Sequence, residues 1–294
     1  MRYHIIHRTT YVYDGPVTIG HYLARLEPRD LPWQDCPWHE LTVSPEPMEF
    51  AGQSDYFGNA CAYFEIAGAH EKLEILSRSY VDVRAAPVFD PSTTPPWETI
   101  REACCADRYD PATAAGEMRF GSPLIQPSKS FGDYAIPSFP PGRPILEGLV
   151  DLTSRVYTDF SFDPTATDSA TPIDVAFEKK RGVCQDFAQV MIACLRSIGL
   201  PARYVSGYLE TIPPPGKPRM VGADASHAWV SLYCGENLGW MDADPTNNCL
   251  PSERHITLAW GRDFQDVSPL TGIALGDGSQ SLRVEVDVIP MVDV

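Results

Sequence analysis

Residues 181–201 read RGVCQDFAQVMIACLRSIGLP, and this segment has the pattern of an amphipathic helix that begins at Cys184. Its apolar side chains recur at three- and four-residue spacing and define one buried face: Phe187, Val190, Met191, Cys194, Leu195 and Ile198. Gly199 and Pro201 predict where the helix ends. Cysteine is more often a small buried residue, as expected for Cys194. A cysteine at the first turn of a helix, however, meets partial positive charge that favours the thiolate, so we predict that Cys184 is a nucleophile.

The segments on either side predict two more helices and a sheet. Residues 145–157 have helical spacing, and Thr171-Pro172-Ile173-Asp174 is typical of a helix start, with Gly182 as the stop. After the cysteine helix the period changes from 3.6 to 2. We expect strands over residues 203–209, 227–234 and 240–244, the last two joined as a hairpin through Gly235-Glu236-Asn237-Leu238-Gly239.

The predicted hairpin brings a histidine and a carboxylate together. His227 shares a strand face with Trp229, while Asp242 and Asp244 share a face of the next strand. Closing the hairpin brings Asp244 to within one or two positions of Trp229 and His227. A thiolate that attacks, an imidazole that moves its proton and a carboxylate that orients the imidazole form a nucleophilic triad. We predict Cys184, His227 and Asp244 in these roles, with Asp242 as an alternative that more often makes a surface contact.

Residues 1–85 predict a different architecture, because short alternating stretches such as Tyr3-His4-Ile5-Ile6-His7 are separated by turn residues. This spacing favours an N-terminal β-sandwich-like domain. Residues 86–150 are rich in proline and predict a packed connector with short helices. We assign residues 151–294 to a catalytic core that includes a half-buried strand at residues 282–288.

Three ordered motifs resemble those of the bacterial transglutaminase-like superfamily. They are Gly182-Val183-Cys184-Gln185-Asp186-Phe187-Ala188, Ser226-His227-Ala228-Trp229-Val230 and Gly239-Trp240-Met241-Asp242-Ala243-Asp244-Pro245-Thr246-Asn247-Asn248. Residues 7–13, 55–59 and 261–269 extend the resemblance over nearly the whole chain. It implies an α+β fold with a papain-like transglutaminase core, in which the cysteine helix packs on an antiparallel sheet. It also implies that Cys184, His227 and Asp244 are the catalytic positions.

The composition restricts the partners and the compartment. The 294 residues carry a formal charge of −16, which disfavours nucleic acid and anionic membrane surfaces as partners. The eight cysteines contain no C-x-x-C pair, and the N-terminus lacks the apolar run of a signal peptide. We therefore expect reduced thiols in a cytoplasmic protein, no cofactor, and a peptide or protein substrate together with an amine acceptor if the enzyme transfers acyl groups.

Several alternatives stay open at this stage. The reaction is cleavage, as in a cysteine protease or amidase, or acyl transfer, as in a transglutaminase; an inactive binding module is the other function considered. A zinc site built from Cys184, His227, Asp244 and Cys234 is less favoured, because no close ligand pair nucleates it. Trp229 and Trp240 are candidate substrate-binding residues, although cross-strand packing is the commoner role for such aromatic pairs. The proline-rich loop at residues 213–219 is a candidate border of the substrate entrance.

Overall fold

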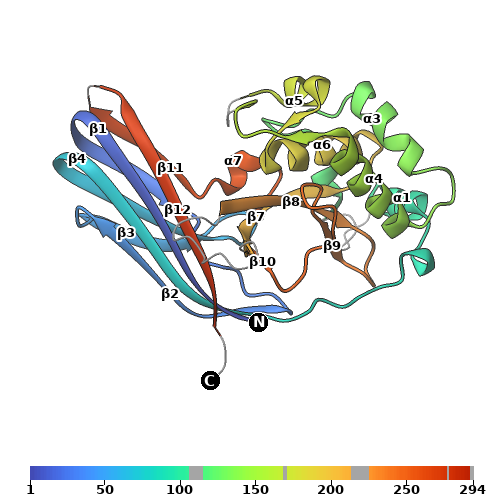
Figure 1. The fold of residues 1–294 in the computed structure, drawn as a ribbon, viewed down its shortest axis with the longest axis horizontal. Coiled ribbons are helices and arrows are strands. Elements are labelled where there is room, and N and C mark those ends of the chain that lie inside the picture. The colour runs from blue at the N-terminus through green and yellow to red at the C-terminus, as the bar shows by residue number, and fades with distance from the viewer. Residues whose placement is uncertain (106–114, 168–170, 213–224, 277, 292–294) are drawn as a thin grey trace.

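The computed structural model describes residues 1–105, 115–167, 171–212, 225–276 and 278–291. Long strands gather on one side of the molecule and helices on the other, with a smaller sheet between them (Figure 1). The two sides share one apolar core, because Tyr3, Ile5 and Val81 of the long strands cluster with residues of the smaller sheet such as Tyr208. None of the helices in the described ranges combines the length and the apolar character needed to cross a bilayer.

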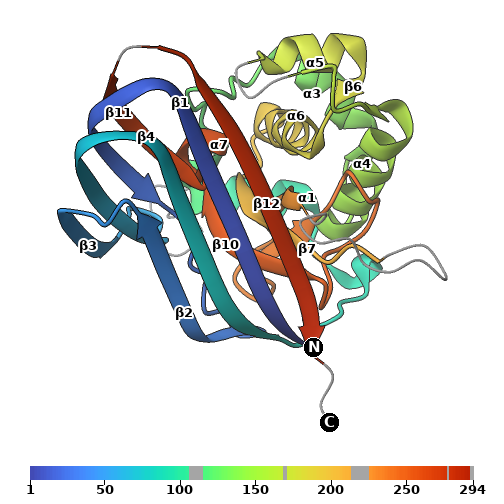
Figure 2. The same ribbon diagram turned by 60° about the vertical axis from the view of Figure 1, so that its left-hand side comes forward.

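The N-terminal sheet is built around two long antiparallel strands, β1 (Arg2–Ala24) and β4 (Ala60–Val83). Shifts in register between Val12 and Ile19 divide β1 into two halves, and the strands arch over at this point (Figure 2). Two shorter strands extend the sheet beside β4, namely β2 (Gln34–Ser44) and β3 (Glu49–Ser54). Tyr13, Leu73 and Ile75 from one half and Tyr22, Phe64 and Ile66 from the other form a second buried cluster. The sandwich-like region is thus one sheet bent on itself.

The C-terminal strands complete this N-terminal sheet. β11 (Leu270–Gly276) pairs with the second half of β1, and β12 (Gln280–Met291) pairs with the first half. The predicted half-buried strand is confirmed in its second part, where Val286 and Val288 are buried, whereas Leu282 and Val284 are exposed. The prediction also places this strand in the catalytic core. The structure pairs it with β1 instead. Alternation predicts one buried face, but it does not indicate which distant strand supplies the hydrogen bonds.

The smaller sheet has the order β10 (His255–Gly261), β7 (Ala202–Leu209), β8 (Ala225–Tyr233) and β9 (Trp240–Ala243), and every neighbouring pair is antiparallel. The predicted hairpin between β8 and β9 is present, closed by the Cys234 N–H bond to the Gly239 carbonyl at 2.8 Å. One face of this sheet packs against the helix α6 (Cys184–Ser197), whose bounds match the prediction closely.

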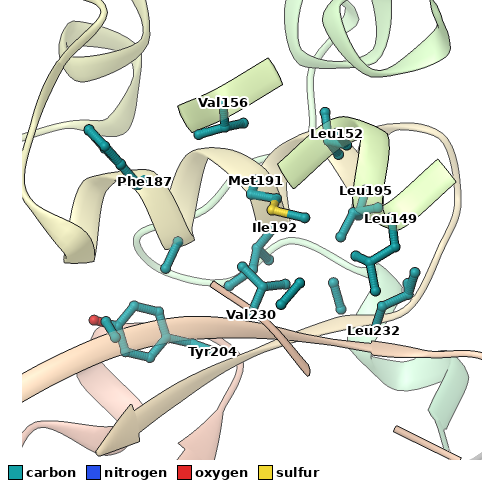
Figure 3. Close-up of a cluster of buried hydrophobic side chains, with 14 of the residues drawn as sticks. Leu149, Leu152, Val156, Phe187, Met191, Ile192, Leu195, Tyr204, Val230 and Leu232 are labelled. Carbon is teal, nitrogen blue, oxygen red and sulfur yellow. The ribbon is translucent and has the colours of Figure 1, made fainter. Parts of the chain in front are cut away.

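A layer of helices covers α6. The predicted helix at residues 145–157 is α4 (Ile145–Asp159), and the helix after Pro172 is α5 (Ile173–Lys179). Leu149, Leu152 and Val156 of α4 lie beside Met191 and Leu195 of α6 (Figure 3). On the other side of α6, Ile192 lies over Val230 of the sheet. Burying these side chains is the main source of stability for the cysteine helix.

The described part of the connector, which omits residues 106–114, consists of short helical pieces packed on the same layer. They are η1 (Pro91–Thr93), α1 (Trp97–Cys105), η2 (Glu117–Arg119), α3 (Lys129–Ala135) and η3 (Ile136–Ser138). Trp97 and Phe131 are buried, as expected for a packed connector. Three small elements complete the described fold: β5 (Ser161–Phe162), β6 (Arg181–Gly182) and α7 (Phe264–Val267).

Hydrogen bonds fix the N-terminal sheet against β10. The Gln34 side chain donates to the Thr257 carbonyl and accepts from its N–H, both at 2.8 Å. Asn59 makes the same reciprocal pair with the backbone of Trp260, both at 2.9 Å. Two amide side chains therefore act like added strand residues along β10, the strand whose first residue is His255.

Candidate functional site

Cys184 is the first residue of α6 and is partly exposed. The turn before it is held by the buried carboxylate of Asp186, whose Oδ2 accepts from the Val183 N–H at 2.7 Å and from Thr167 Oγ1 at 2.6 Å. Gly182 leaves room for this carboxylate, because a Cβ at that position would lie 2.4 Å from Asp186 Oδ2. These hydrogen bonds therefore hold the first turn of α6 in place next to Cys184.

Lys180 is a second anchor of this turn that sequence analysis missed. It caps α5 in the left-handed region, at φ 51°, where glycine is the usual residue. Its Nζ lies 3.8, 4.2 and 4.4 Å from the ring centroids of Phe177, Tyr134 and Phe160. Three cation–π contacts of this kind stabilise the cap. The aromatic residues come from different elements, so no local signal in the sequence predicts the contact.

His227 lies in β8, where it hydrogen-bonds to Asp244 and lies near Cys184. Its Nε2 lies 2.7 Å from Asp244 Oδ2, and the Cys184 side chain lies close enough to the ring to influence its pKa. Because Nε2 faces Asp244, the nitrogen left for the thiol is Nδ1. Burial lowers the pKa of His227, but the interactions with Asp244 and Cys184 outweigh this and raise the pKa to about 10. The structure thus brings the three predicted residues together and favours a protonated imidazole.

Asp244 follows β9 and is completely buried. A backbone bridge with Cys249 closes its turn, and the backbone N–H groups of Thr246 and Asn247 donate to Oδ1 at 2.9 and 3.2 Å. Burial raises the pKa of Asp244, yet its bonds from His227, His255 and Asn247 prevail and hold the pKa well below the usual range. The carboxylate is therefore ionised in the presence of His227.

Two further donors bind the same carboxylate oxygen. Asn247 Nδ2 lies 2.7 Å and His255 Nε2 lies 3.1 Å from Asp244 Oδ2. His255 stands apart from the three motifs, so nothing in the sequence pairs it with Asp244. The placement of Asn247 in the turn after Asp244 is the only signal that could have indicated a donor there.

The two candidate substrate-binding tryptophans are placed differently. Trp229 has no exposed surface, and its indole N–H donates to Asp242 Oδ2 at 3.0 Å. This is the packing role that sequence analysis weighs as the alternative, and it removes Trp229 from a substrate surface. Trp240 is partly exposed and packs beside Tyr233 and Arg203. Asp242 accepts the indole bond rather than making a surface contact, which leaves Asp244 as the partner of His227.

The groups suited to a metal are already joined by hydrogen bonds. One ligand atom each from His227, Asp244 and His255 lies within 4.8 Å of the others. A metal there would have to displace the bond between His227 and Asp244. Cys234, the fourth group of the less favoured zinc hypothesis, is buried elsewhere and donates to the Leu232 carbonyl at 3.6 Å. The candidate entrance loop at residues 213–219 lies outside the described residues.

Two parts of the chain match known protein families. Residues 3–82 match the bacterial transglutaminase-like N-terminal region, and residues 140–245 match the transglutaminase-like superfamily. The chain belongs to the transglutaminase-like superfamily, as the resemblance predicts.

Individual relatives extend this assignment over the full length. An uncharacterized protein of Mycobacterium tuberculosis (strain ATCC 25618 / H37Rv) is 41% identical over 98% of this chain and 93% of its own. A Mycobacterium leprae protein, also uncharacterized, is 31% identical over 98% of both chains. A Pseudomonas aeruginosa protein-glutamine gamma-glutamyltransferase is 34% identical, but over only 31% of this chain and 14% of its own.

Among solved structures, a Cytophaga hutchinsonii protein described as a "putative cysteine protease" superposes with a TM-score of 0.78. The superposition covers 100% of this chain and 92% of that one, at 21% identity. The α+β class, with a strand-rich N-terminal region and a transglutaminase-like core, is confirmed.

Proposed function

We propose that the protein is a thiol enzyme that cleaves or transfers an amide acyl group on a peptide or protein through a thioester on Cys184. The observation that carries this proposal is the hydrogen bond from His227 to the buried carboxylate of Asp244, with Cys184 at the start of α6 close enough to the ring to raise its pKa. Each group in it has the chemistry that one step of acyl transfer needs.

In the first half reaction the Cys184 thiolate attacks the amide carbon. The developing oxyanion lies beside the start of α6, where the Cys184 backbone N–H has no carbonyl partner within the helix. The His227 imidazolium then donates its proton to the leaving amine as the carbon–nitrogen bond breaks, and Cys184 keeps the acyl group as a thioester. Asp244 holds the imidazole in line and stabilises its positive charge.

In the second half reaction neutral His227 takes a proton from the incoming nucleophile. Water releases a carboxylic acid, the outcome of a protease or amidase, whereas an amine forms a new amide, the outcome of a transglutaminase. The relatives support both readings, because one is described as a cysteine protease and another as a glutamyltransferase. We therefore propose the thioester chemistry. Identifying the acceptor as water or an amine will distinguish cleavage from transfer.

The partners follow from the same chemistry. Thiol, imidazole and carboxylate supply the nucleophile, the proton transfer and the orientation, so the proposed reaction uses no cofactor. The formal charge of −16 suits a cationic amine acceptor better than a nucleic acid or an anionic membrane. A nucleophilic thiol needs protection from oxidation, which is why we propose a reducing, cytoplasmic setting.

The alternative is an inactive binding module. A protein released from catalysis has no need to keep a thiol beside an imidazole that is hydrogen-bonded to a completely buried carboxylate. Burying Asp244 carries a desolvation cost that only such hydrogen bonds offset. The intact arrangement therefore supports the enzyme over the binding module.

Alkylation of the free protein tests the proposal without knowledge of the substrate. Iodoacetamide near neutral pH should label Cys184 at least tenfold faster than Cys194, because burial raises the pKa of Cys194 to about 12. His227→Gln should abolish most of this preference, while His39→Gln, at a distant histidine, should keep it. Equal labelling of Cys184 in the wild type and in His227→Gln would exclude the activated thiol.

Substrate identity needs a second measurement. Intact-mass spectrometry after exposure to peptide pools should detect an acyl adduct on the wild type and none on Cys184→Ala. The adduct mass identifies the acyl donor. A binding module would give no adduct, and its captured partners would not change on Cys184→Ala substitution.

A further inference from the structure

We propose that His255 is a positioning residue of the active site: a neutral histidine that donates to Asp244 and thereby holds the carboxylate in line with His227. The inference rests on the proposed thiol chemistry, and it adds a fourth residue to the line from Cys184 through His227 to Asp244. His255 belongs to none of the motifs that carry the family resemblance, and it enters the site from another strand.

The position of His255 is set by the N-terminal sheet. It is the first residue of β10, the strand that Gln34 and Asn59 hold through their reciprocal bonds to Thr257 and Trp260. Its ring lies edge-on to the buried Trp229, at 5.4 Å between centroids and 83° between planes. Only 5% of its side chain is exposed, so the ring is held in one orientation.

Both ring nitrogens are engaged, and their partners determine the tautomer. The backbone N–H of Ser252 donates to His255 Nδ1 at 3.3 Å, while Nε2 lies 3.1 Å from Asp244 Oδ2. A nitrogen that accepts a hydrogen bond carries no proton, so the single proton of the neutral ring is on Nε2. His255 consequently donates to Asp244. An imidazolium would have to give up the bond from Ser252.

Charge explains why a neutral donor suits this place. The titratable groups around His227 are Cys184 on α6, Asp244 after β9 and His255 on β10. The His227 imidazolium already bonds to Asp244 Oδ2, and a second cation at His255 would compete with it for the same oxygen. A neutral N–H instead adds a bond to Oδ2 without adding a charge.

The consequence lies in the geometry of Asp244. With Asn247 and the turn N–H groups, His255 satisfies the carboxylate on every side that His227 does not occupy. The carboxylate then stays fixed when the proton leaves His227 during the reaction. Without His255, Oδ2 gains freedom to turn or to take up water, and the imidazolium loses part of its stabilisation.

A pair of variants separates the donor from the packing. His255→Gln keeps an N–H for Asp244 and a carbonyl for the Ser252 N–H, whereas His255→Phe keeps the ring against Trp229 but neither polar bond. His39→Phe, at a half-buried histidine of the N-terminal sheet, is the matched control for removing a histidine. Thermal unfolding of each variant establishes that it is folded.

Two measurements compare the variants. Nuclear magnetic resonance on histidine-labelled protein gives the titration midpoint of the His227 ring. Steady-state kinetics, with a substrate identified from the adduct mass, give kcat and KM. We expect His255→Phe to lower the His227 midpoint by about one pH unit and kcat by about tenfold to a hundredfold, with KM nearly unchanged. His255→Gln should restore most of both, and His39→Phe should change neither. The wild-type spectrum should show His255 Nδ1 without a proton.

The outcomes distinguish this inference from the proposed function. Three results would each overturn the role of His255. The first is a folded His255→Phe with the wild-type His227 titration midpoint and kcat. The others are a His255→Gln as impaired as His255→Phe, and a proton on His255 Nδ1. If His255→Phe does not fold, the role of His255 is tested by its tautomer in the wild type and by the His227 midpoint and kcat of His255→Gln. A wild-type His227 that titrates near its ordinary value, together with an unreactive Cys184, would instead refute the thiol enzyme itself.

Discussion

The Nε2 atom of His227 lies 2.7 Å from Asp244 Oδ2, and this bond joins the middle strand β8 to the turn that follows β9. The register of the hairpin makes the contact possible, because Val230 pairs with Ala243 and Asp244 therefore comes level with Trp229. A shift of one residue would turn Asp244 to the other face of the sheet. The site thus depends on the hairpin register as well as on the identities of its residues.

Asp244→Asn should lower the rate of acylation by about 10³- to 10⁴-fold, because a neutral amide neither stabilises the His227 imidazolium nor fixes its tautomer. The rate of thioester formation, followed by mass spectrometry under single-turnover conditions, measures this loss. Asp242→Asn is the matched control, since its amide oxygen can still accept the Trp229 indole bond. Equal losses in the two variants would mean that Asp244 has no special role.

The stabilisation from His227 should depend on pH in a specific direction. Its folded-state pKa of about 10 lies above the ordinary value of 6.5, so the folded protein binds the proton more tightly than the unfolded chain. The contribution is complete below about pH 6.5 and is lost as the pH rises through about 10. The difference in urea unfolding free energy between the wild type and His227→Gln should shrink over this range; a constant difference would contradict the raised pKa.

His7 should make the protein sensitive to acid. It is buried between the Tyr208 hydroxyl at 2.8 Å and Thr9 Oγ1 at 3.2 Å, and burial lowers the pKa of its ring to about 4. Its neutral form is favoured in the folded state, so stability is complete above about pH 6.5 and falls as the pH drops toward 4.

His7→Gln should remove part of this acid sensitivity, because glutamine has no charge to gain. A shift of this size corresponds to about 3 kcal/mol at most. Urea midpoints measured between pH 4.5 and 7.5 should therefore fall more steeply for the wild type than for His7→Gln. Parallel curves would show that protonation of His7 costs nothing.

Gly182→Ala should damage the cysteine turn, because the new Cβ would lie 2.4 Å from Asp186 Oδ2. The carboxylate must then move away from the Val183 N–H, and the first turn of α6 shifts with it. We expect a loss of about 1–3 kcal/mol in unfolding free energy together with slower alkylation of Cys184. Gly52→Ala is the control, since nothing lies within 4 Å of a Cβ there. Wild-type alkylation in Gly182→Ala would mean that the turn tolerates the shift.

Much of the local structure could be predicted from the sequence. The bounds of α6, the start of α5 after Pro172 and the hairpin at Gly239 follow from spacing, capping and turn residues that act within a few positions. The preference for Asp244 over Asp242 follows from the family motif and from the turn that begins at Asp244. These signals are local, so one sequence carries them.

The strand faces were only half predictable. Alternation correctly places His227 and Trp229 on one face of β8, but it does not indicate whether other residues cover that face. In the fold, Arg203 and Trp260 stack on that face, and Arg29 of the N-terminal region lies 3.6 Å from the Trp260 ring centroid. Both faces are covered, which is why Trp229 is buried. Alternation indicates which side chains share a face of a strand, whereas the burial of that face depends on tertiary packing.

The sequence by itself determined the class of fold, the helix that begins at Cys184 and the three residues of the proposed triad, because periodicity, caps and ordered motifs express short-range physics. The tertiary structure decided the rest. It paired β12 with β1, placed Lys180 among three aromatic rings and brought His255 to Asp244 from a separate strand. These contacts join residues far apart in the chain, and they form only when burial of a shared apolar core outweighs the entropy lost in closing the intervening loops.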